Sequence, residues 1–377
     1  MVQLPASPLH AVKTISKLLN VSEKGLWRIY FLVRRNRGYT QFEIPKRSGG
    51  ARQIHKPIDD LFYVQGQIKS LILDSAPEPP DCVTAFRRGL SIRDHALVHC
   101  DKMVLVKLDL KDFFPSVSFT RVWGIFEDLG LSQRDARLLA YLTTIESDLA
   151  SPSPIAQLKL QNNKFTSIAK SAISELYAGV EEMYEHSKSY DNEISSNLAD
   201  SAFVQKMHVQ ELEARAKPRI LKRRGLPQGA PTSPQLANLA ARRLDARLLG
   251  LAASMGFQYT RYADDLTFST TDHRGKVNVL KWSVEQIVND CGFTLNAEKT
   301  TVMRAPATRL TTGLIVNGSE PRVRRSTIRL VRAMLHQKSL GKLPDDEIAK
   351  LNGYMSFIRM ANPEQARKLL NEPDSSV

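Results

Sequence analysis

This sequence of 377 residues has few cysteines, no long apolar run and no cluster of potential zinc ligands. Its three cysteines (Cys82, Cys100 and Cys291) lie far apart, which excludes a disulfide framework and indicates a reducing, cytoplasmic environment. No apolar stretch approaches the ~20 residues that span a bilayer, so a transmembrane protein is excluded. The N-terminus lacks a basic region followed by an unbroken apolar run, so we expect no secretion signal. The eight scattered histidines disfavour a zinc site.

The sequence does have an excess of positive charge. Fifty-three Lys and Arg residues against 39 Asp and Glu residues give a formal net charge of +14. A surplus of this size favours a polyanionic partner, either nucleic acid or an anionic membrane surface. Hydrophobic residues make up 42% of the chain, which is enough for a soluble fold with a real core. Charge alone names no reaction.

The apolar periodicity predicts helices that alternate with antiparallel hairpins. The ranges expected to be helical are 9–36, 60–75, 120–145, 234–255, 281–292 and the tail from 322. The ranges expected to be strands are the two halves of 39–58, a buried strand at 103–110, and a strand–turn–strand at 257–270. This alternation indicates an α+β core with an antiparallel sheet and helical ends.

Three carboxylates stand in contexts that suggest catalysis. Asp109 ends the buried strand, and Asp264 and Asp265 lie at the turn of the later hairpin. Adjacent acids repel each other, and each prefers a compensating cation. Mg²⁺ takes carboxylate and phosphate oxygens, and two such ions ~3.5–4 Å apart could activate a hydroxyl and stabilise departing pyrophosphate. Taken singly, each acid is more often turn or capping chemistry, so only the joint pattern favours catalysis.

Five sequence boxes occur in a fixed order. They are LDLKDFF at 108–114, LPQGAPTSP at 226–234, YADD at 262–265, GFTLNAEKT at 292–300 and TTGLIVNG at 311–318. Together they resemble the boxes of bacterial retron-type reverse transcriptases, which are RNA-directed DNA polymerases. The resemblance runs from about 39 to 365 and implies a right-hand polymerase with fingers, an antiparallel palm with helices, and a helical thumb.

With this resemblance, the changes in pattern suggest six parts of the chain. They are an N-terminal helical segment at 1–38, fingers at 39–102, the first part of the palm at 103–146, a helical insertion at 147–217, the second part of the palm at 218–320, and a thumb at 321–377. The insertion has helical spacing and is locally acidic over 171–200. Acidic residues are ill-suited to RNA, so the insertion could dock an effector protein or be a solvated elaboration.

The resemblance also implies roles around the three acids. Asp109 and Asp264 would be the main metal ligands on adjacent strands, with Asp265 in a supporting role. The carbonyl of Leu110 could complete one metal shell. The implied cofactor is a pair of Mg²⁺ ions, with Mn²⁺ as the alternative.

A second group of residues is expected around the incoming dNTP. Phe114 would be the steric gate that leaves no room for a 2′-hydroxyl. Gln228 and Gly229 would lie against the sugar and base, because glycine allows close backbone approach. Two basic residues of the first hairpin, Lys46 and Arg52, are suited to clamp the triphosphate.

Lys299 has two interpretations that the sequence leaves open. It could be a general acid for pyrophosphate or a structural lysine.

Two further boxes bear on RNA recognition and differ from the family pattern at one position each. Retron enzymes carry NAxxH, whereas residues 95–99 are HALVH, with His95 in place of the asparagine. They also carry VTG, whereas residues 311–313 are TTG. The residues expected to bind RNA are His95, His99, Arg322, Arg324 and Arg325.

The resemblance implies that the partner is a cognate noncoding RNA that serves as template and primer. Synthesis would start from a guanosine 2′-hydroxyl and leave a branched RNA–DNA product. An antiphage role and an effector protein encoded nearby are also implied, and no membrane is involved. The alternatives are another defence-associated or group II intron-like bacterial reverse transcriptase, or an RNA-binding scaffold that restrains an effector. A scaffold would need no intact set of acids.

Overall fold

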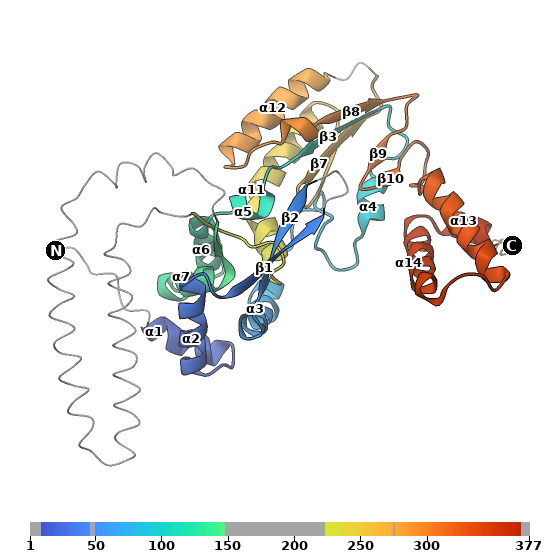
Figure 1. Ribbon diagram of the computed structural model, residues 1–377. Helices are drawn as coiled ribbons and strands as arrows, with labels where there is room; N and C mark the ends of the chain where they lie inside the picture. Colours follow the sequence, from blue (N-terminus) through green and yellow to red (C-terminus); the bar gives the residue numbers. More distant parts are fainter. Residues whose placement is uncertain (1–8, 46–49, 148–222, 274–275, 371–377) are drawn as a thin grey trace, which may run out of the picture.

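The computed structural model describes residues 9–45, 50–147, 223–273 and 276–370. Figure 1 shows short helices at one end, the central sheet in the middle and the C-terminal helices at the other end. Within these ranges, no helix is long and apolar enough to cross a bilayer.

The helices at the first end come from separate parts of the chain. They are α1 (Leu9–Leu18), α2 (Glu23–Arg34), α3 (Asp59–Leu71), α6 (Phe119–Asp128) and α7 (Gln133–Thr143). The stretch 9–36, expected as one helical region, is two helices. Asn20 adopts a left-handed φ of 52°, and the Ser22 side chain accepts a hydrogen bond from the Gly25 amide at 3.1 Å. The first residue ends α1, and the second caps α2.

The expected first hairpin is confirmed. Strands β1 (Tyr39–Pro45) and β2 (Ala51–Pro57) pair antiparallel over their full length. Figure 1 shows the hairpin extending from the N-terminal helices toward the sheet. Its tip, which includes Lys46, lies outside the described residues. Two short elements follow α3, namely η1 (Leu73–Ser75) and α4 (Ile92–Leu97).

The central sheet has the strand order β6-β7-β3-β8, and all neighbouring strands are antiparallel. Its strands are β3 (Val104–Asp109), β6 (Gln258–Tyr262), β7 (Asp265–Thr270) and β8 (Thr301–Arg304). These strands confirm the buried strand and the strand–turn–strand expected from the sequence. Two long helices, α11 (Ser233–Ser254) and α12 (Val277–Asp290), lie on one side of the sheet, and α4 lies on the other (Figure 1).

The two sides of this sheet differ, because alternate residues of a strand face opposite sides. One side carries apolar residues such as Val106, Leu108 and Phe268, which belong to the main hydrophobic core with α11 and α12. The other side carries polar residues such as Lys107 and Thr267. We call them the apolar face and the polar face. Both end at the same sheet edge, where the acids lie.

The two strands that flank the segment expected to be an insertion lie side by side. Strand β4 (Ile145–Ser147) and strand β5 (Arg223–Gly225) flank it and pair antiparallel. The half-buried Arg224 fastens this pair, because its guanidinium donates to the Tyr141 carbonyl at 3.1 Å and to the Thr144 hydroxyl at 3.2 Å. The helical prediction for 147–217 itself falls almost entirely outside the described residues.

The C-terminal part begins with a small strand pair and continues as helices. Its elements are β9 (Leu310–Thr311), β10 (Leu314–Ile315), α13 (Arg325–Ser339), α14 (Asp345–Ala361) and α15 (Pro363–Leu370). Residues of β10 and of the three helices share a second hydrophobic core with Leu105 of β3 and Ala96 of α4. The helical tail predicted from 322 is confirmed, and this second core fastens it to the polar face.

Candidate active site

Three carboxylates gather at one edge of the central sheet. Asp109 is the last residue of β3 and pairs directly with Asp265, the first residue of β7. Asp264 lies in the two-residue turn between β6 and β7, after Ala263, which has a φ of 56°. Its carbonyl accepts a hydrogen bond from the Leu110 amide at 2.9 Å. The sequence predicted Asp264 on the strand beside Asp109, but the residue opposite Asp109 is Asp265, because the tight turn occupies residues 263–264.

The negative charge at this edge is only partly compensated by lysines. Lys299, the last residue of η2 (Ala297–Lys299), places its Nζ 2.8 and 3.0 Å from the two carboxylate oxygens of Asp109. Lys107 lies 3.7 Å from Asp265. Burial, and then the neighbouring charges of Asp109 and Asp265, raise the pKa of Asp264. Burial also raises the pKa of Asp265, although Lys107 opposes the shift. A further cation would therefore stabilise both carboxylates.

The chemistry of this edge fits Mg²⁺. All three side chains offer carboxylate oxygens, the ligands that hard divalent cations prefer. No three His, Cys, Asp or Glu side chains of the described ranges are close enough to form a complete protein cage. Mg²⁺ does not need such a cage, because it is commonly held by one or two carboxylates together with substrate phosphates and water. Lys299 now occupies the position of a counter-ion to Asp109.

Phe114 lies directly after this edge, in the short helix α5 (Phe113–Ser116). Its ring is half-buried, with the rings of Phe113 and Phe86 at 5.6 and 6.0 Å between centroids. Phe113 is buried in the main core against Phe293. The role of Phe114 as a gate stays a prediction.

Gln228 and Gly229 contact the first hairpin. The His55 amide donates to the Gln228 carbonyl at 2.7 Å. Gly229 has a φ of 108°, and a Cβ built on it would lie 2.8 Å from a methyl carbon of Ile54. The close approach that requires glycine is therefore to β2 in this structure. Arg52 lies on the same strand, two residues before Ile54, and is exposed.

Comparisons with known proteins decide the family. The family model for reverse transcriptase (RNA-dependent DNA polymerase) matches residues 180–337. The retron Mx65 reverse transcriptase of Myxococcus xanthus is 34% identical over 92% of this chain and 67% of its own length. The chain belongs to the retron-type reverse transcriptases.

Two further matches have lower identity. The retron Mx162 reverse transcriptase of the same organism is 32% identical, over 88% of this chain and 59% of its own length. The chain therefore spans between 59% and 67% of the length of these two relatives. The telomerase of Candida albicans, solved in complex with a TWJ fragment of telomeric RNA, has a TM-score of 0.39 and 12% identity, over 88% of this chain and 56% of the telomerase chain. Reverse transcriptases use divalent metal ions and RNA templates, in keeping with the donor set at the sheet edge.

Two histidines predicted to bind RNA are inside this reverse transcriptase. His95 and His99 are both 0% exposed. The Thr260 hydroxyl lies between them, 2.9 Å from Nδ1 of His95 and 2.7 Å from Nε2 of His99. Burial lowers the pKa of His95 to about 3, with a contribution from the charge of Lys107. The prediction of direct RNA contact was wrong for both, because their rings fasten α4 to the polar face.

The two positions that differ from the retron pattern touch each other. Nε2 of His95 lies 3.1 Å from the Thr311 hydroxyl and 3.1 Å from the Thr267 hydroxyl. A valine at 311, as in the family pattern, would offer no hydroxyl. His95 and Thr311, which stand where the family pattern has asparagine and valine, therefore meet in one buried contact.

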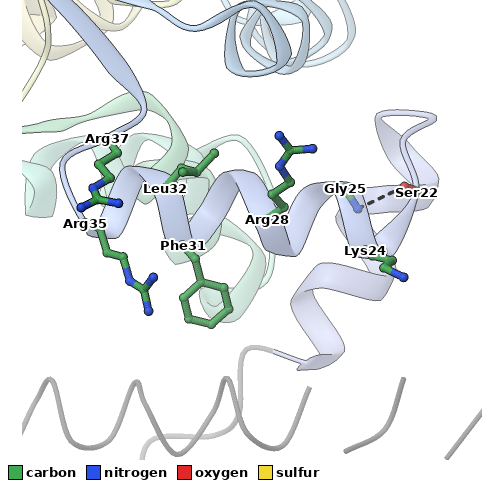
Figure 2. A pocket seen from close by; sticks show the side chains of 8 residues that line it. All are labelled: Ser22, Lys24, Gly25, Arg28, Phe31, Leu32, Arg35 and Arg37. Atoms are coloured by element: carbon green, nitrogen blue, oxygen red, sulfur yellow. Dashed lines mark hydrogen bonds between the residues drawn. The ribbon is translucent and has the colours of Figure 1, made fainter. Parts of the chain in front are cut away.

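The basic residues at the start of the predicted thumb remain accessible. Arg322, Arg324 and Arg325 are exposed, and Arg325 begins α13. RNA contact by these arginines stays a prediction. A second basic region, a hollow of about 430 Å³, lies along α2 (Figure 2). Lys24, Arg28, Arg35 and Arg37 line it together with smaller and apolar residues. No residue predicted for the active site lines this hollow.

Sequence reasoning missed one ion pair beside the turn at residues 263–264, which we call the catalytic turn because a catalytic role is predicted for its Asp264. Arg261 precedes the YADD box and is fully buried with Asp245 of α11. A signal for it was present. Asp245 follows Ala241 by four residues and Asn238 by seven, which puts a carboxylate on the buried stripe of a helix. Burial of a carboxylate requires a partner. The sequence does not single out that partner, because Arg242, Arg243 and Arg247 all lie closer to Asp245 along the chain than Arg261 does.

Proposed function

We propose that this chain copies a cognate structured noncoding RNA into single-stranded DNA, starting from a guanosine 2′-hydroxyl of that RNA. The product would be a branched RNA–DNA molecule, and the biological role antiphage defence. The observation that carries the polymerase part is the sheet edge, where Asp109 and Asp265 are paired and Asp264 is adjacent. The family supports the RNA template, and the net charge of +14 supports phosphate contacts.

In this proposal the acids bind two Mg²⁺ ions, with Mn²⁺ as an alternative. When bound, the metal supplies the positive charge that activates the attacking hydroxyl and stabilises the pyrophosphate. Asp109 and Asp265 are directly paired, so their side chains lie on the same side of the sheet. The pKa values of Asp264 and Asp265 are raised, so a bound cation would stabilise their charged forms. Lys299 is half-exposed, so it can turn from Asp109 toward the triphosphate and protonate the leaving group.

The remaining residues would position the nucleotide and the RNA. Phe114 excludes the 2′-hydroxyl of a ribonucleotide, Arg52 and Lys46 hold the triphosphate, and Gln228 lies against the sugar. The exposed arginines at the start of α13 would contact RNA phosphates, and the basic hollow along α2 adds further positive charge. We retain the division into fingers, palm and thumb with the boundaries expected from the sequence.

The decisive experiment compares the nucleic acid that co-purifies with the wild-type chain and with Asp264→Ala/Asp265→Ala. We expect a branched RNA–DNA molecule with the wild type and RNA alone with the variant. The matched control is Asp128→Ala, which removes an exposed carboxylate at the end of α6. If Asp264→Ala/Asp265→Ala yields as much DNA as the wild type and the Asp128→Ala control, the polymerase is refuted. Linear DNA from the wild type would indicate another class of reverse transcriptase.

A partner protein is the second part of the proposal. Because β4 and β5 pair, the segment between them can be shortened without separating the flanking strands. We propose that the acidic stretch 171–200 of this segment docks an effector encoded nearby. Deletion of 165–205 should leave DNA synthesis intact and abolish co-purification of the effector, and unchanged co-purification would contradict the docking role.

A further inference from the structure

Arg261 is a buried charge beside the catalytic turn. It is the largest fully buried side chain of the described residues, and its Nε and Nη2 donate to the two oxygens of Asp245, both at 2.7 Å. Tyr259 donates to the same carboxylate at 3.0 Å. This arrangement is bidentate, so the plane of the guanidinium is fixed relative to α11.

The remaining amino group of Arg261 is directed at the turn itself. Its Nη1 donates to the carbonyl of Ala263 at 3.1 Å and to Oδ1 of Asn238 at 3.1 Å. Ala263 has the left-handed φ that forms the turn, and Asp264 follows it directly. A left-handed conformation is unfavourable for alanine, so it persists only where the surroundings enforce it. The hydrogen bond from Arg261 is such a constraint.

The same guanidinium also contacts the residue that precedes Phe114. It lies 5.6 Å from the centre of the Phe113 ring, and Phe113 precedes the predicted gate Phe114. Asn238, which accepts from Arg261, donates in turn to the carbonyl of Ala85, the residue before Phe86. The centroid of the Phe86 ring in turn lies 6.0 Å from that of Phe114. Arg261 thus connects to the catalytic turn and to both aromatic neighbours of the gate.

We propose that Arg261 is a positioning residue that sets the catalytic turn and the Phe114 ring at a fixed separation. Asp245 orients the guanidinium, Nη1 holds the Ala263 carbonyl, and the guanidinium plane supports Phe113. Loss of this connection would leave the three carboxylates present, but it would shift their position relative to the sugar of the incoming nucleotide. The proposal rests on the polymerase function proposed above.

A structural role alone makes a different prediction. Breaking a buried ion pair from one side leaves an unpaired charge, whereas removing both partners together is often tolerated. If the pair only stabilises the fold, the double replacement should restore stability and activity together. If Arg261 positions the turn, the double replacement should restore stability but not the rate, because no donor then reaches the Ala263 carbonyl.

The experiment measures dTTP and UTP incorporation on poly(rA)–oligo(dT), with melting temperature as a second readout. The variants are Arg261→Lys and Arg261→Met/Asp245→Leu. We expect the double variant to fold and to lose kcat on the order of 100-fold, as for a small misplacement of reacting groups. The KM for dTTP should change by no more than about threefold, since the variant keeps the contacts that bind dTTP equally well in the ground state and the transition state. The preference for dTTP over UTP should shrink.

A matched control separates burial from position. Gln65→Met removes a fully buried amide that donates to the Tyr39 hydroxyl at 2.8 Å and the Leu142 carbonyl at 2.7 Å. It should lower the melting temperature and leave kcat unchanged. If neither Arg261 variant folds, Asn238→Ala tests the same connection with a smaller loss of kcat, about tenfold, because the ion pair is retained.

The outcomes separate the positioning role from the polymerase itself. A double variant with wild-type kcat and nucleotide preference, or Asn238→Ala with wild-type kcat, overturns the positioning role. A wild-type chain that incorporates no dTTP overturns the polymerase instead.

Discussion

On the apolar face of the central sheet the buried polar group is an ion pair, whereas on the polar face it is a pair of neutral imidazoles. Arg261 and Asp245 satisfy each other under α11. His95 and His99 are satisfied under α4 by threonine and serine hydroxyls, including Thr260 between them. Both groups are fully buried. Both are also next to β6, the strand that leads into the catalytic turn, because Thr260 and Arg261 are consecutive residues of that strand.

The difference follows from whether the side chain can lose its proton when it is buried. Arginine stays charged at any ordinary pH, so its burial requires a carboxylate. Histidine can lose its proton, so hydroxyl partners suffice and burial lowers its pKa instead. Stability on the apolar face should therefore depend on an intact partner, and stability on the polar face should depend on pH. The predictions below test that contrast.

The largest effect is expected from Asp245→Ala. It leaves the Arg261 guanidinium buried without its carboxylate, which costs about 3–5 kcal/mol of the free energy of unfolding. Urea denaturation of the full chain measures the loss. The control is Asp290→Ala, which breaks the more exposed ion pair with Arg247 and should cost far less, because solvent screens an exposed pair. Equal losses from the two variants would contradict the contrast between the faces.

The second effect is acid destabilisation through the polar face. The folded-state pKa of His95 is about 3 and that of His99 lies well below 6.5, whereas an unfolded histidine titrates near 6.5. The unfolded state therefore binds more protons below pH 6.5, and the stabilising contribution is lost as the pH falls from 6.5 toward 3. The slope should be about 1.4 kcal/mol per pH unit for each histidine.

This slope is measured as the difference between wild type and His99→Gln from pH 7 to pH 4.5. Asp264 and Asp265 act in the opposite direction, because their raised pKa values mean that protonation relieves repulsion in the folded state. Comparing variants at each pH removes that contribution. His273→Gln, at an exposed histidine, should match wild type. A His99→Gln slope equal to that of wild type would show that the buried ring does not control the acid response.

A smaller effect is expected where the two exchanged positions meet. Thr311→Val removes one hydroxyl partner of His95 but leaves Thr267, so it should cost about 1 kcal/mol. His95→Asn should cost more, because it also leaves empty volume. The double variant restores the family pattern at both positions, and it should be less unstable than the sum by about 0.5–1 kcal/mol. Strict additivity would show that the two exchanges are independent.

The smallest effect is expected from Lys107→Met. Removing this charge weakens one of the causes that lower the pKa of His95. A smaller gap between folded and unfolded pKa values means less stability lost in acid, by less than about 0.1 kcal/mol at pH 4.5 and a few tenths of a kcal/mol once the series is extended to about pH 3.5, where the folded-state ring begins to bind a proton. The measurement is the same denaturation series. A larger acid loss in Lys107→Met than in wild type would contradict the direction.

Several features of the fold could be predicted from particular residues. The alternating hairpin around residues 257–270, the buried strand ending at Asp109 and the helix after the LPQG box all depend on local patterns, and all are present. The breaks inside 9–36 and 120–145 were missed. At the first break, one left-handed asparagine and one serine cap interrupt a continuous apolar periodicity. Such short-range interruptions are weaker signals than the period itself.

The candidate site shows the same division. The three acids could be found because their boxes are contiguous in sequence. The environment of His95 could not, since its four hydroxyl partners come from residues 84, 260, 267 and 311. A box that suggested RNA recognition proved to be an internal contact. The contact of Gly229 with β2 could not be predicted either, because Ile54, which holds the atom nearest to its missing side chain, is distant in sequence; its contact with the nucleotide stays a prediction.

The sequence by itself determined the family, the three acids and the positive charge, because these are properties of contiguous residues and of composition. The tertiary structure alone decided which acid faces Asp109, which histidines are buried and what holds the catalytic turn. Those answers depend on strand register and on helices packed from distant parts of the chain. Register reverses the side of every residue with a one-residue shift, so only the folded sheet could place Asp265 opposite Asp109 and Arg261 beneath the turn.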